Sequence, residues 1–153
     1  MTARVEPPES EEGQPFWEAT RERRLILPWC LECRKPFWYP RAVCPRCLSA
    51  RIEWREASGR GSIHAASVQH SAAVPQMADR TPYVVALVDL DEGVRMMSNI
   101  VGCEPDAARA GMAVQVGWEE LSDGRCLPVF EPAAPPTQRD ERDETEETHV
   151  GNL

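Results

Sequence analysis

The pattern of apolar and polar positions changes from helical to strand-like near Ile52. Segment 15–26 has a proline at its first position and is rich in Ala, Glu and Arg, which favours a short N-terminal helix. Beyond Ile52 the period becomes two, apart from the β-branched run 83–90, which is long enough for a buried strand. Val114, Val116 and Trp118 occupy alternate positions and share one face of a predicted strand. The chain is therefore expected to be mainly β, with these three side chains directed into a barrel.

Tight turns divide the β-rich part of the chain. Gly59 and Gly61 indicate a bulge or a sharp bend, and the sequence DEG at 91–93 is typical of a hairpin turn. The strands between these breaks have the number and spacing of a small closed barrel. Residues 51–131 are therefore predicted to form a five-stranded OB-fold.

Both ends of the chain are polar and rich in proline and acidic residues. Segments 1–14 and 132–153 contain almost no large apolar side chains, so they cannot bury the surface that offsets the entropy lost on folding. Disordered acidic tails are expected at both ends.

Four cysteines form two Cys-x-x-Cys pairs with ten residues between them, Cys30 with Cys33 and Cys44 with Cys47. Each pair brings two thiolates to one side of a turn, and two such turns facing each other complete a tetrahedral set of sulfur ligands. A closed set leaves no position for a substrate, so a structural metal is expected. Residues 27–50 are predicted to form a rubredoxin-like zinc ribbon, and iron remains an alternative because the spacing suits both ions.

The expected compartment favours a metal site over disulfides. The N-terminus has no apolar run behind a basic start, so we expect no signal peptide and no membrane span, and a cytoplasmic protein. Reducing conditions there disfavour disulfides. A redox-active pair is another alternative, but such a pair normally occurs singly beside a βαβ pattern, which this chain lacks.

The net charge of −8 is unevenly distributed. Residues 21–60 carry ten Arg and Lys against four Asp and Glu, whereas the rest of the chain is acidic. The overall acidity argues against sequence-independent binding of nucleic acid, which depends on neutralising phosphates. The basic segment is a solvated face or a site for an anion or an acidic partner.

The order of these features resembles a known family. The cysteine-containing segment 16–47, the sequence SGRGSIHAASVQH at 58–70, the stretch 82–116 and the final LPVFEP at 127–132 are together similar to OB-fold acyl-CoA-associated proteins with an N-terminal rubredoxin-like zinc ribbon. The similarity covers residues 15–132. The combination in this order is specific, whereas each piece alone is not.

This resemblance implies an accessory role. Members of the family are small subunits of thiolase-fold proteins, among them thiolases, hydroxymethylglutaryl-CoA synthase, acyltransferases and the lipid-transfer-protein-like aldolases of steroid side-chain degradation. The partner supplies the catalytic residues, so this chain is not expected to be an enzyme on its own. The resemblance also implies that Cys30, Cys33, Cys44 and Cys47 are the zinc ligands. Where such ribbons often have glycine after the first pair, this chain has Arg34, so the first turn is expected to differ.

Residues outside the ribbon offer no strong catalytic set. No sequence signature supplies Cys103 or Cys126 with a base or cation arranged to lower the pKa of its thiol, so both are expected to be small buried side chains. His64 and His70 face the same side of a regular strand, as an acid and a base or as ligand contacts, but structural hydrogen bonds are the commoner role. A bulge between them removes the shared face. His149 lies in the acidic tail and is expected to be inert.

Aromatic residues are concentrated near the ribbon. Four of the five tryptophans lie within residues 17–54, more than so small a module needs for its own packing. We therefore expect Trp17 and Trp38 to contribute to a surface for the larger partner. The break at 71–82 is predicted to be a flap beside an acyl-CoA channel or an ordinary surface loop.

The prediction is a non-catalytic, zinc-binding subunit that scaffolds a thiolase-fold enzyme acting on acyl-CoA substrates, in lipid or steroid metabolism. The alternative is a module that binds single-stranded nucleic acid, because zinc ribbons and OB-folds occur together there and interleaved arginines and aromatic residues suit phosphates and bases. A free-standing acyl-CoA hydrolase is a third alternative, for which no nucleophile and carboxylate pair is evident.

Overall fold

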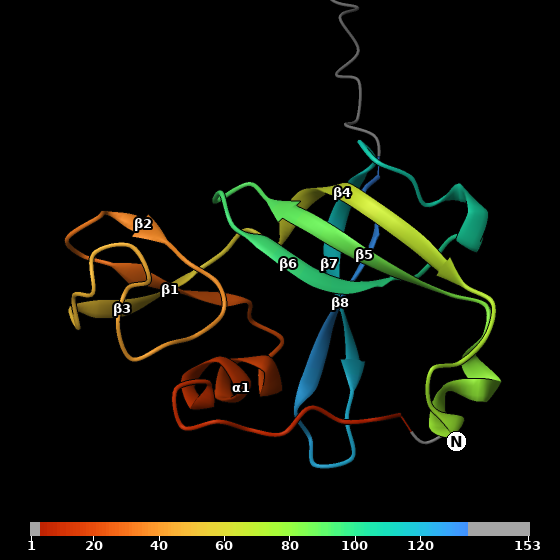
Figure 1. The fold of residues 1–153 in the computed structure, drawn as a ribbon, viewed down its shortest axis with the longest axis horizontal. Coiled ribbons are helices and arrows are strands. Elements are labelled where there is room, and N and C mark those ends of the chain that lie inside the picture. Colours follow the sequence, from red (N-terminus) through yellow and green to blue (C-terminus); the bar gives the residue numbers. More distant parts are fainter. Residues whose placement is uncertain (1–3, 135–153) are drawn as a thin grey trace, which may run out of the picture.

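The computed structural model describes residues 4–134, so most of the predicted C-terminal tail lies outside it (Figure 1). A small sheet lies on one side and a barrel on the other, with the helix beside both. Within these residues, every helix is too short or too polar to cross a bilayer. The elements in chain order are α1 (Gln14–Arg21), β1 (Ile26–Cys30), β2 (Lys35–Pro36), β3 (Ile52–Glu56), β4 (Arg60–Gln69), η1 (Pro75–Arg80), β5 (Tyr83–Leu90), β6 (Arg95–Ile100), η2 (Pro105–Ala107), β7 (Ala113–Glu120) and β8 (Cys126–Pro132).

The ribbon is a three-stranded antiparallel sheet in the order β2-β1-β3. β1 pairs with β3 along its length, from Ile26 opposite Glu56 to Cys30 opposite Ile52. β3 therefore belongs to the ribbon sheet, although the sequence pattern assigns residues 51–56 to the OB-fold. The period of two is the same in both sheets, so it does not tell which sheet a strand joins.

α1 is shorter than the helix predicted for residues 15–26. It ends at Arg21, and Arg23 adopts a left-handed conformation with φ 56°, which stops the helix. Residues 25–27 are buried where β1 begins. The helix prediction is therefore correct for the first part of the segment, and its apolar end is used in a strand.

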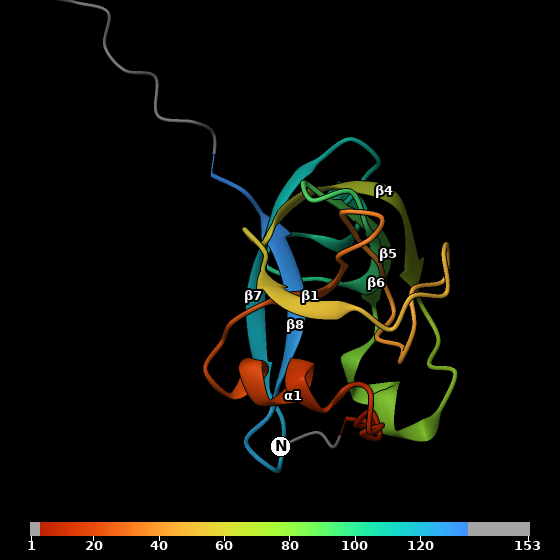
Figure 2. The same ribbon diagram turned by 90° about the vertical axis from the view of Figure 1, so that its left-hand side faces the viewer.

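The second unit is a closed five-stranded barrel in the order β4-β5-β6-β8-β7 (Figure 2). β4 pairs with β5 along most of its length and with β7 near its start, which closes the barrel. β6 and β8 meet in parallel at Ile100 and Phe130, and the other pairs are antiparallel. This is the five-stranded OB-type architecture. The prediction of a mainly β fold with a helix, a ribbon and a barrel is confirmed.

Alternate side chains fill the barrel. Every second residue of β5 is buried, from Val84 to Leu90. In β7, Val114 is buried, and Val116 and Trp118 pack against the core while partly exposed, as the alternation predicts. The exclusion of this apolar surface from water is the main source of stability in the barrel.

Two glycines let β4 and the turn before it approach neighbouring strands closely. Gly59 has φ 77°, and a Cβ there would lie 2.4 Å from Cγ1 of Val116. A Cβ on Gly61 would lie 2.4 Å from the backbone oxygen of Asp89. The predicted irregularity is present, because the register of β4 against β5 shifts around His64.

The N-terminal strap, defined as residues 4–13, lies against the barrel, although composition predicts a disordered tail for residues 1–14. Arg4 forms an ion pair with Glu119 at 2.8 Å and donates to the side-chain oxygen of Asn99 at 2.7 Å. These partners lie far away in the sequence. Composition alone therefore gave no sign that polar contacts hold this segment in place.

Candidate functional site

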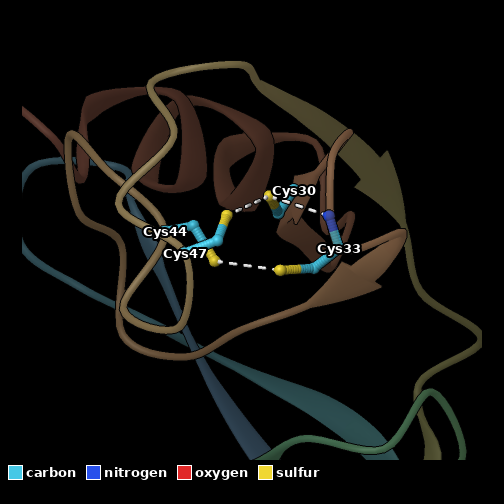
Figure 3. Close-up of side chains that lie close together, drawn as sticks. All are labelled: Cys30, Cys33, Cys44 and Cys47. Atoms are coloured by element: carbon cyan, nitrogen blue, oxygen red, sulfur yellow. Dashed lines mark hydrogen bonds between the residues drawn. The ribbon is translucent and has the colours of Figure 1, made fainter.

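The two cysteine pairs face each other in the ribbon, as Figure 3 shows. Cys30 ends β1 and Cys33 lies in the following turn, whereas Cys44 and Cys47 lie between β2 and β3. All four sulfur atoms lie within 4.8 Å of one another. The sulfur atoms of Cys30 and Cys47 are 3.6 Å apart, and those of Cys33 and Cys44 are 3.9 Å apart. The fold thus brings the four predicted ligands together.

These separations suit one tetrahedral metal ion. Sulfur atoms about 2.3 Å from a central zinc ion lie about 3.8 Å apart along the edges of a tetrahedron, and the observed 3.6 and 3.9 Å lie on either side of that length. The backbone N–H groups of Cys33 and Arg46 donate to the sulfur atoms of Cys30 and Cys44, each at 3.4 Å. Such bonds orient the ligands and stabilise negative charge on sulfur.

A left-handed residue follows each cysteine pair. Arg34 has φ 56° and Leu48 has φ 62°, and each comes directly after the second cysteine of its pair. Their N–H groups donate to the carbonyl oxygens of Cys30, at 2.8 Å, and of Cys44, at 2.9 Å. The two turns are therefore alike, and Arg34 does not make the first one different. Glycine adopts this conformation most easily, which is a physical reason for glycine at this place in similar ribbons.

The four thiols can all be deprotonated at the same time only if a cation is bound among them. Burial raises the pKa of the Cys44 thiol, but the backbone N–H groups of Cys47 and Arg46 outweigh it and lower the pKa to about 6. The backbone N–H of Ser49 lowers the pKa of Cys47, whereas the thiol of Cys33, burial and the other thiols raise it to about 12. One thiol therefore ionises near neutral pH while a close neighbour keeps its proton. A bound divalent cation lets all four ionise.

The burial of this centre indicates a structural role. Cys30 and Cys44 are buried, and Cys47 is exposed. Besides the cysteines, the buried cluster of the ribbon contains Phe37, with Ile52 packed against it. So few apolar side chains hold a module only weakly, and an ion with four thiolate ligands has no open position for a substrate. The site is suited to holding the ribbon together.

His64 lies in an exposed polar cluster on the barrel. Its Nδ1 is 3.4 Å from a carboxylate oxygen of Asp89 and 3.0 Å from Arg95, which pairs with Asp89 at 2.6 Å. The hydrogen bond from Arg95 lowers the pKa of Asp89. The three side chains are between 40% and 48% exposed, so water screens their charges. The arrangement is that of a surface ion pair with a histidine beside it.

The other reactive candidates lie apart from one another. His70 follows the end of β4, and the irregularity at His64 removes the shared face of the two histidines. Cys126 is buried and Cys103 is partly buried, and neither thiol is paired with a base among residues 4–134. His149 lies outside the described residues.

An apolar cleft of about 490 Å³ lies between the ribbon and the barrel. Its walls come from the strap, from α1, from the loop after β2, and from β5, β6 and β8. Tyr39 and Met97 line it and are 56% and 59% exposed. The indole nitrogen of Trp38, which also lines it, is buried and has no hydrogen-bond acceptor among the described residues.

Sequence reasoning found part of this cleft. It assigned Trp17 and Trp38 to an interaction surface, but both side chains are partly buried, because Phe16 packs edge-on against each ring with centroids 5.0 Å apart. The contributions of Met97 and of the strap were missed. A methionine on a predicted strand was only a weak signal, and the position of the strap depends on contacts distant in sequence.

Two family models match the chain and divide it within β3. Residues 17–53 match the rubredoxin-like zinc ribbon domain of ChsH2, and residues 54–119 match the C-terminal OB-fold domain of ChsH2. The chain belongs to the ChsH2 family. The resemblance found in the sequence is therefore confirmed at the level of both domains.

Curated relatives share this region over different lengths. The chain is 41% identical over 121 residues to the "Probable enoyl-CoA hydratase alpha subunit" of Thermomonospora curvata, which covers 78% of this chain and 37% of that protein. It is 37% identical over 95 residues to a "DUF35 domain-containing scaffold protein" of Methanothermobacter thermautotrophicus. That match covers 61% of this chain and 71% of the scaffold protein. The chain thus spans little more than a third of the hydratase subunit and most of the scaffold protein.

A solved structure shares both fold and sequence. One chain of the "Ltp2-ChsH2(DUF35) aldolase" matches with a TM-score of 0.76 and 37% identity, covering 84% of this chain and 100% of that chain. The proteins that this chain resembles are therefore described as a hydratase subunit, as a scaffold and as an aldolase.

Proposed function

We propose that this chain is a non-catalytic, zinc-binding accessory subunit that binds a thiolase-fold enzyme acting on acyl-CoA substrates. The observation that supports this most directly is the similarity over the full length of the matched aldolase chain, with a TM-score of 0.76 and 37% identity. Relatives with this domain are named for different reactions or for a scaffold. A domain that accompanies different chemistries is better suited to support than to catalysis.

Zinc is the ion that we propose for the ribbon. It has no redox chemistry and prefers the tetrahedral four-sulfur set that the cysteines offer, although iron fits the same separations. A reducing cytoplasm suits the site because it keeps the thiols free for metal. Metal analysis of the purified protein should find about one zinc per chain, and a visible iron–sulfur absorption would contradict this assignment.

The partner is proposed to cover the face that Tyr39, Met97 and Val5 share around the cleft. These large apolar side chains are 56%, 59% and 53% exposed. Neighbouring exposed apolar side chains are typical of protein interfaces. Trp17 and Trp38 lie partly buried beside them, so they support this surface more than they form it.

Co-purification tests the assembly. The tagged chain is co-expressed with the thiolase-fold protein encoded nearest to it, and a stable complex is expected. Tyr39→Ala combined with Met97→Ser should weaken the complex, because it removes apolar contact area. Val74→Ser is the matched control, since Val74 is an exposed apolar side chain that does not line the cleft. Failure of the unmodified chain to form a complex contradicts the proposal.

The nucleic-acid alternative has one favourable observation. The guanidinium of Arg55 lies 4.4 Å from the ring centroid of Trp29, a pair of the kind that can hold a base. However, Arg55 is paired with Glu53, and the net charge of −8 opposes phosphate binding. We expect no mobility shift with a single-stranded oligonucleotide at physiological salt, and a salt-dependent shift would favour the alternative.

A further inference from the structure

We propose that the strap is a releasable latch on the face that binds the partner, with buried Arg125 as the residue that positions it. The partner binds the latched form, in which the strap lies against the barrel. The assembly part of this inference rests on the proposed function. The latch itself is tested separately, on the isolated chain without any partner.

Arg125 carries a buried charge that the strap helps to stabilise. The residue is 5% exposed, so its guanidinium has little contact with water. Its Nε donates to the carboxylate of Asp123 at 2.7 Å, and its Nη1 donates to the carbonyl oxygen of Pro7 at 2.9 Å. The carboxylate of Glu9 lies 3.4 Å from the same Nε, and the ring centroid of Trp17 lies 4.8 Å from the guanidinium carbon. A buried charge is costly unless such groups replace its water, and the strap supplies two of them, Pro7 and Glu9.

A second contact joins the strap to the same turn of the barrel. Ser122 and Arg125 both lie in the turn between β7 and β8, which the strap passes before it reaches α1 (Figure 1). The backbone N–H and the hydroxyl of Ser122 donate to the two carboxylate oxygens of Glu6, each at 2.7 Å. Together with the ion pair between Arg4 and Glu119, these bonds attach the strap at three places.

The strap is held mainly by polar contacts. None of residues 4–12 is fully buried, and Val5 is 53% exposed. The strap therefore buries little of the apolar surface that gives folded segments most of their stability. Polar contacts contribute less because water competes for the same groups. Segments of this kind open locally without unfolding the whole domain, so the strap can detach while the barrel stays folded.

Release of the strap would remove part of the proposed docking face. Val5 and Pro7 line the cleft, and Val5 belongs to the exposed apolar face that also contains Tyr39 and Met97. A partner that contacts all three apolar side chains finds them together only in the latched form. Binding then favours the latched form, and the apparent affinity falls in proportion to the fraction of chains that are latched.

Backbone NMR relaxation tests the latch on the zinc-loaded, full-length chain. The tested change is Glu6→Ala with Glu9→Ala, which removes the two strap carboxylates that contact the turn. The matched control is Glu11→Ala with Glu12→Ala. It removes the same charge from two exposed strap residues whose side chains have no hydrogen-bond or ion-pair partner among residues 4–134.

The order parameters of the Val5 and Ser10 amides are the measurement. They should lie near about 0.85, as in rigid backbone, in the unmodified chain and in the control, and fall below about 0.6 when Glu6 and Glu9 are replaced. Barrel amides should keep their values, because no barrel residue is changed. Low values already in the unmodified chain, or unchanged values after the replacement, overturn the latch.

Arg125→Gln tests the positioning residue. Loss of the charge should lower the same two order parameters, while metal content stays the same because Arg125 lies outside the cysteine cluster. Wild-type order parameters in folded Arg125→Gln protein overturn the role of Arg125. The replacement of Glu6 and Glu9 gives an independent test, because neither side chain belongs to the barrel core.

Affinity for the co-purified thiolase-fold partner tests the assembly part. Replacement of Glu6 and Glu9 should weaken the complex about fivefold or more, and the control should leave it unchanged. Arg125→Gln should weaken it similarly, although a side chain that is 5% exposed offers almost no surface to a partner. Unchanged affinity with a loosened strap overturns the assembly part. Absence of a complex with the unmodified chain contradicts the proposed function but not the relaxation result, so the two failures are distinguishable.

Discussion

The zinc ribbon and the OB barrel are stabilised by different means. The buried cluster of the ribbon consists of Cys30, Phe37 and Cys44, two of which are candidate metal ligands. The buried cluster of the barrel is a continuous set of apolar side chains from five strands, α1 and β1, with Phe130 fully enclosed. We therefore propose that metal substitutes in the ribbon for the apolar core that the barrel has.

The two units are nevertheless joined. Leu27 is a residue of β1 in the ribbon sheet, yet it belongs to the apolar cluster of the barrel, as does Phe16 of α1. The base of the ribbon is thus anchored in the barrel, while its cysteine turns depend on metal. Different perturbations should therefore unfold different parts of one chain.

Loss of metal is expected to have the largest effect. Cys44→Ser removes a fully buried candidate ligand, and metal binding contributes on the order of 10 kcal/mol to small zinc modules. Amide NMR signals of residues 30–52 should lose their dispersion while barrel signals remain. Cys103→Ser, outside the cluster, is the matched control and should keep full metal content. A Cys44→Ser protein with unchanged metal content and ribbon signals would contradict a structural metal.

Phe130→Ala should produce the converse result. Its side chain is fully buried, and truncation of such a residue costs about 3–5 kcal/mol through lost burial and the cavity left behind. Thermal unfolding should show a lower barrel transition, while metal remains bound in the folded protein. Release of metal in step with mild destabilisation of the barrel would show that the units do not behave separately.

Gly61→Ala tests the close approach of β4 and β5. The new Cβ would lie 2.4 Å from the backbone oxygen of Asp89, so the strands must move apart, at a cost of about 1–3 kcal/mol. Gly117→Ala is the matched control, because the nearest atoms to its Cβ would be 3.8 Å away. Chemical denaturation should show a lower free energy of unfolding for Gly61→Ala than for Gly117→Ala. Equal stabilities would contradict the tight packing at Gly61.

Arg34→Gly should stabilise the ribbon slightly. A φ of 56° costs any residue with a Cβ about 1 kcal/mol in the folded state, and glycine avoids that cost. Glycine also gains conformational freedom in the unfolded state, which offsets part of the stabilisation. We expect slower loss of metal to a chelator, and a similar change for Leu48→Gly because its φ of 62° is equivalent. Faster loss in both variants would indicate that these side chains make contacts that matter more than the backbone conformation.

The smallest expected effect is a pH dependence in the barrel. The hydrogen bond from Arg95 lowers the pKa of Asp89 in the folded state. The stabilisation that this ion pair gives the folded barrel is therefore present above the pKa of Asp89 in the unfolded chain, about 3.9. It is lost as the pH falls through the lower pKa of Asp89 in the folded state. Because the side chains are 40% and 48% exposed, its size is at most about 1 kcal/mol. Asp89→Asn should therefore destabilise at pH 7 and have less effect near pH 3, and an equal effect at both would contradict this.

Local features of the fold were predictable from the sequence. A Cys-x-x-Cys turn is formed by consecutive residues, so its spacing alone indicated how Cys30, Cys33, Cys44 and Cys47 meet. The alternation of β7 likewise predicted which of its residues face the barrel core. These signals do not depend on which distant segments pair.

Features assembled from distant segments were not predictable in this way. The period of two in residues 52–56 is compatible with either sheet, and only the pairing with β1 places that strand in the ribbon. The strap is held by Arg4 through partners on β6 and β7. The cleft combines segments from both units, so single side chains such as Met97 carried only a weak signal of it.

A thioester turnover assay tests the accessory role most directly. Acyl-CoA is incubated with the zinc-loaded chain alone, with its thiolase-fold partner alone and with the complex of the two. The account predicts no CoA release or product from the chain alone and activity of the partner's kind in the complex. Catalytic turnover of an acyl-CoA by the purified chain alone would contradict it.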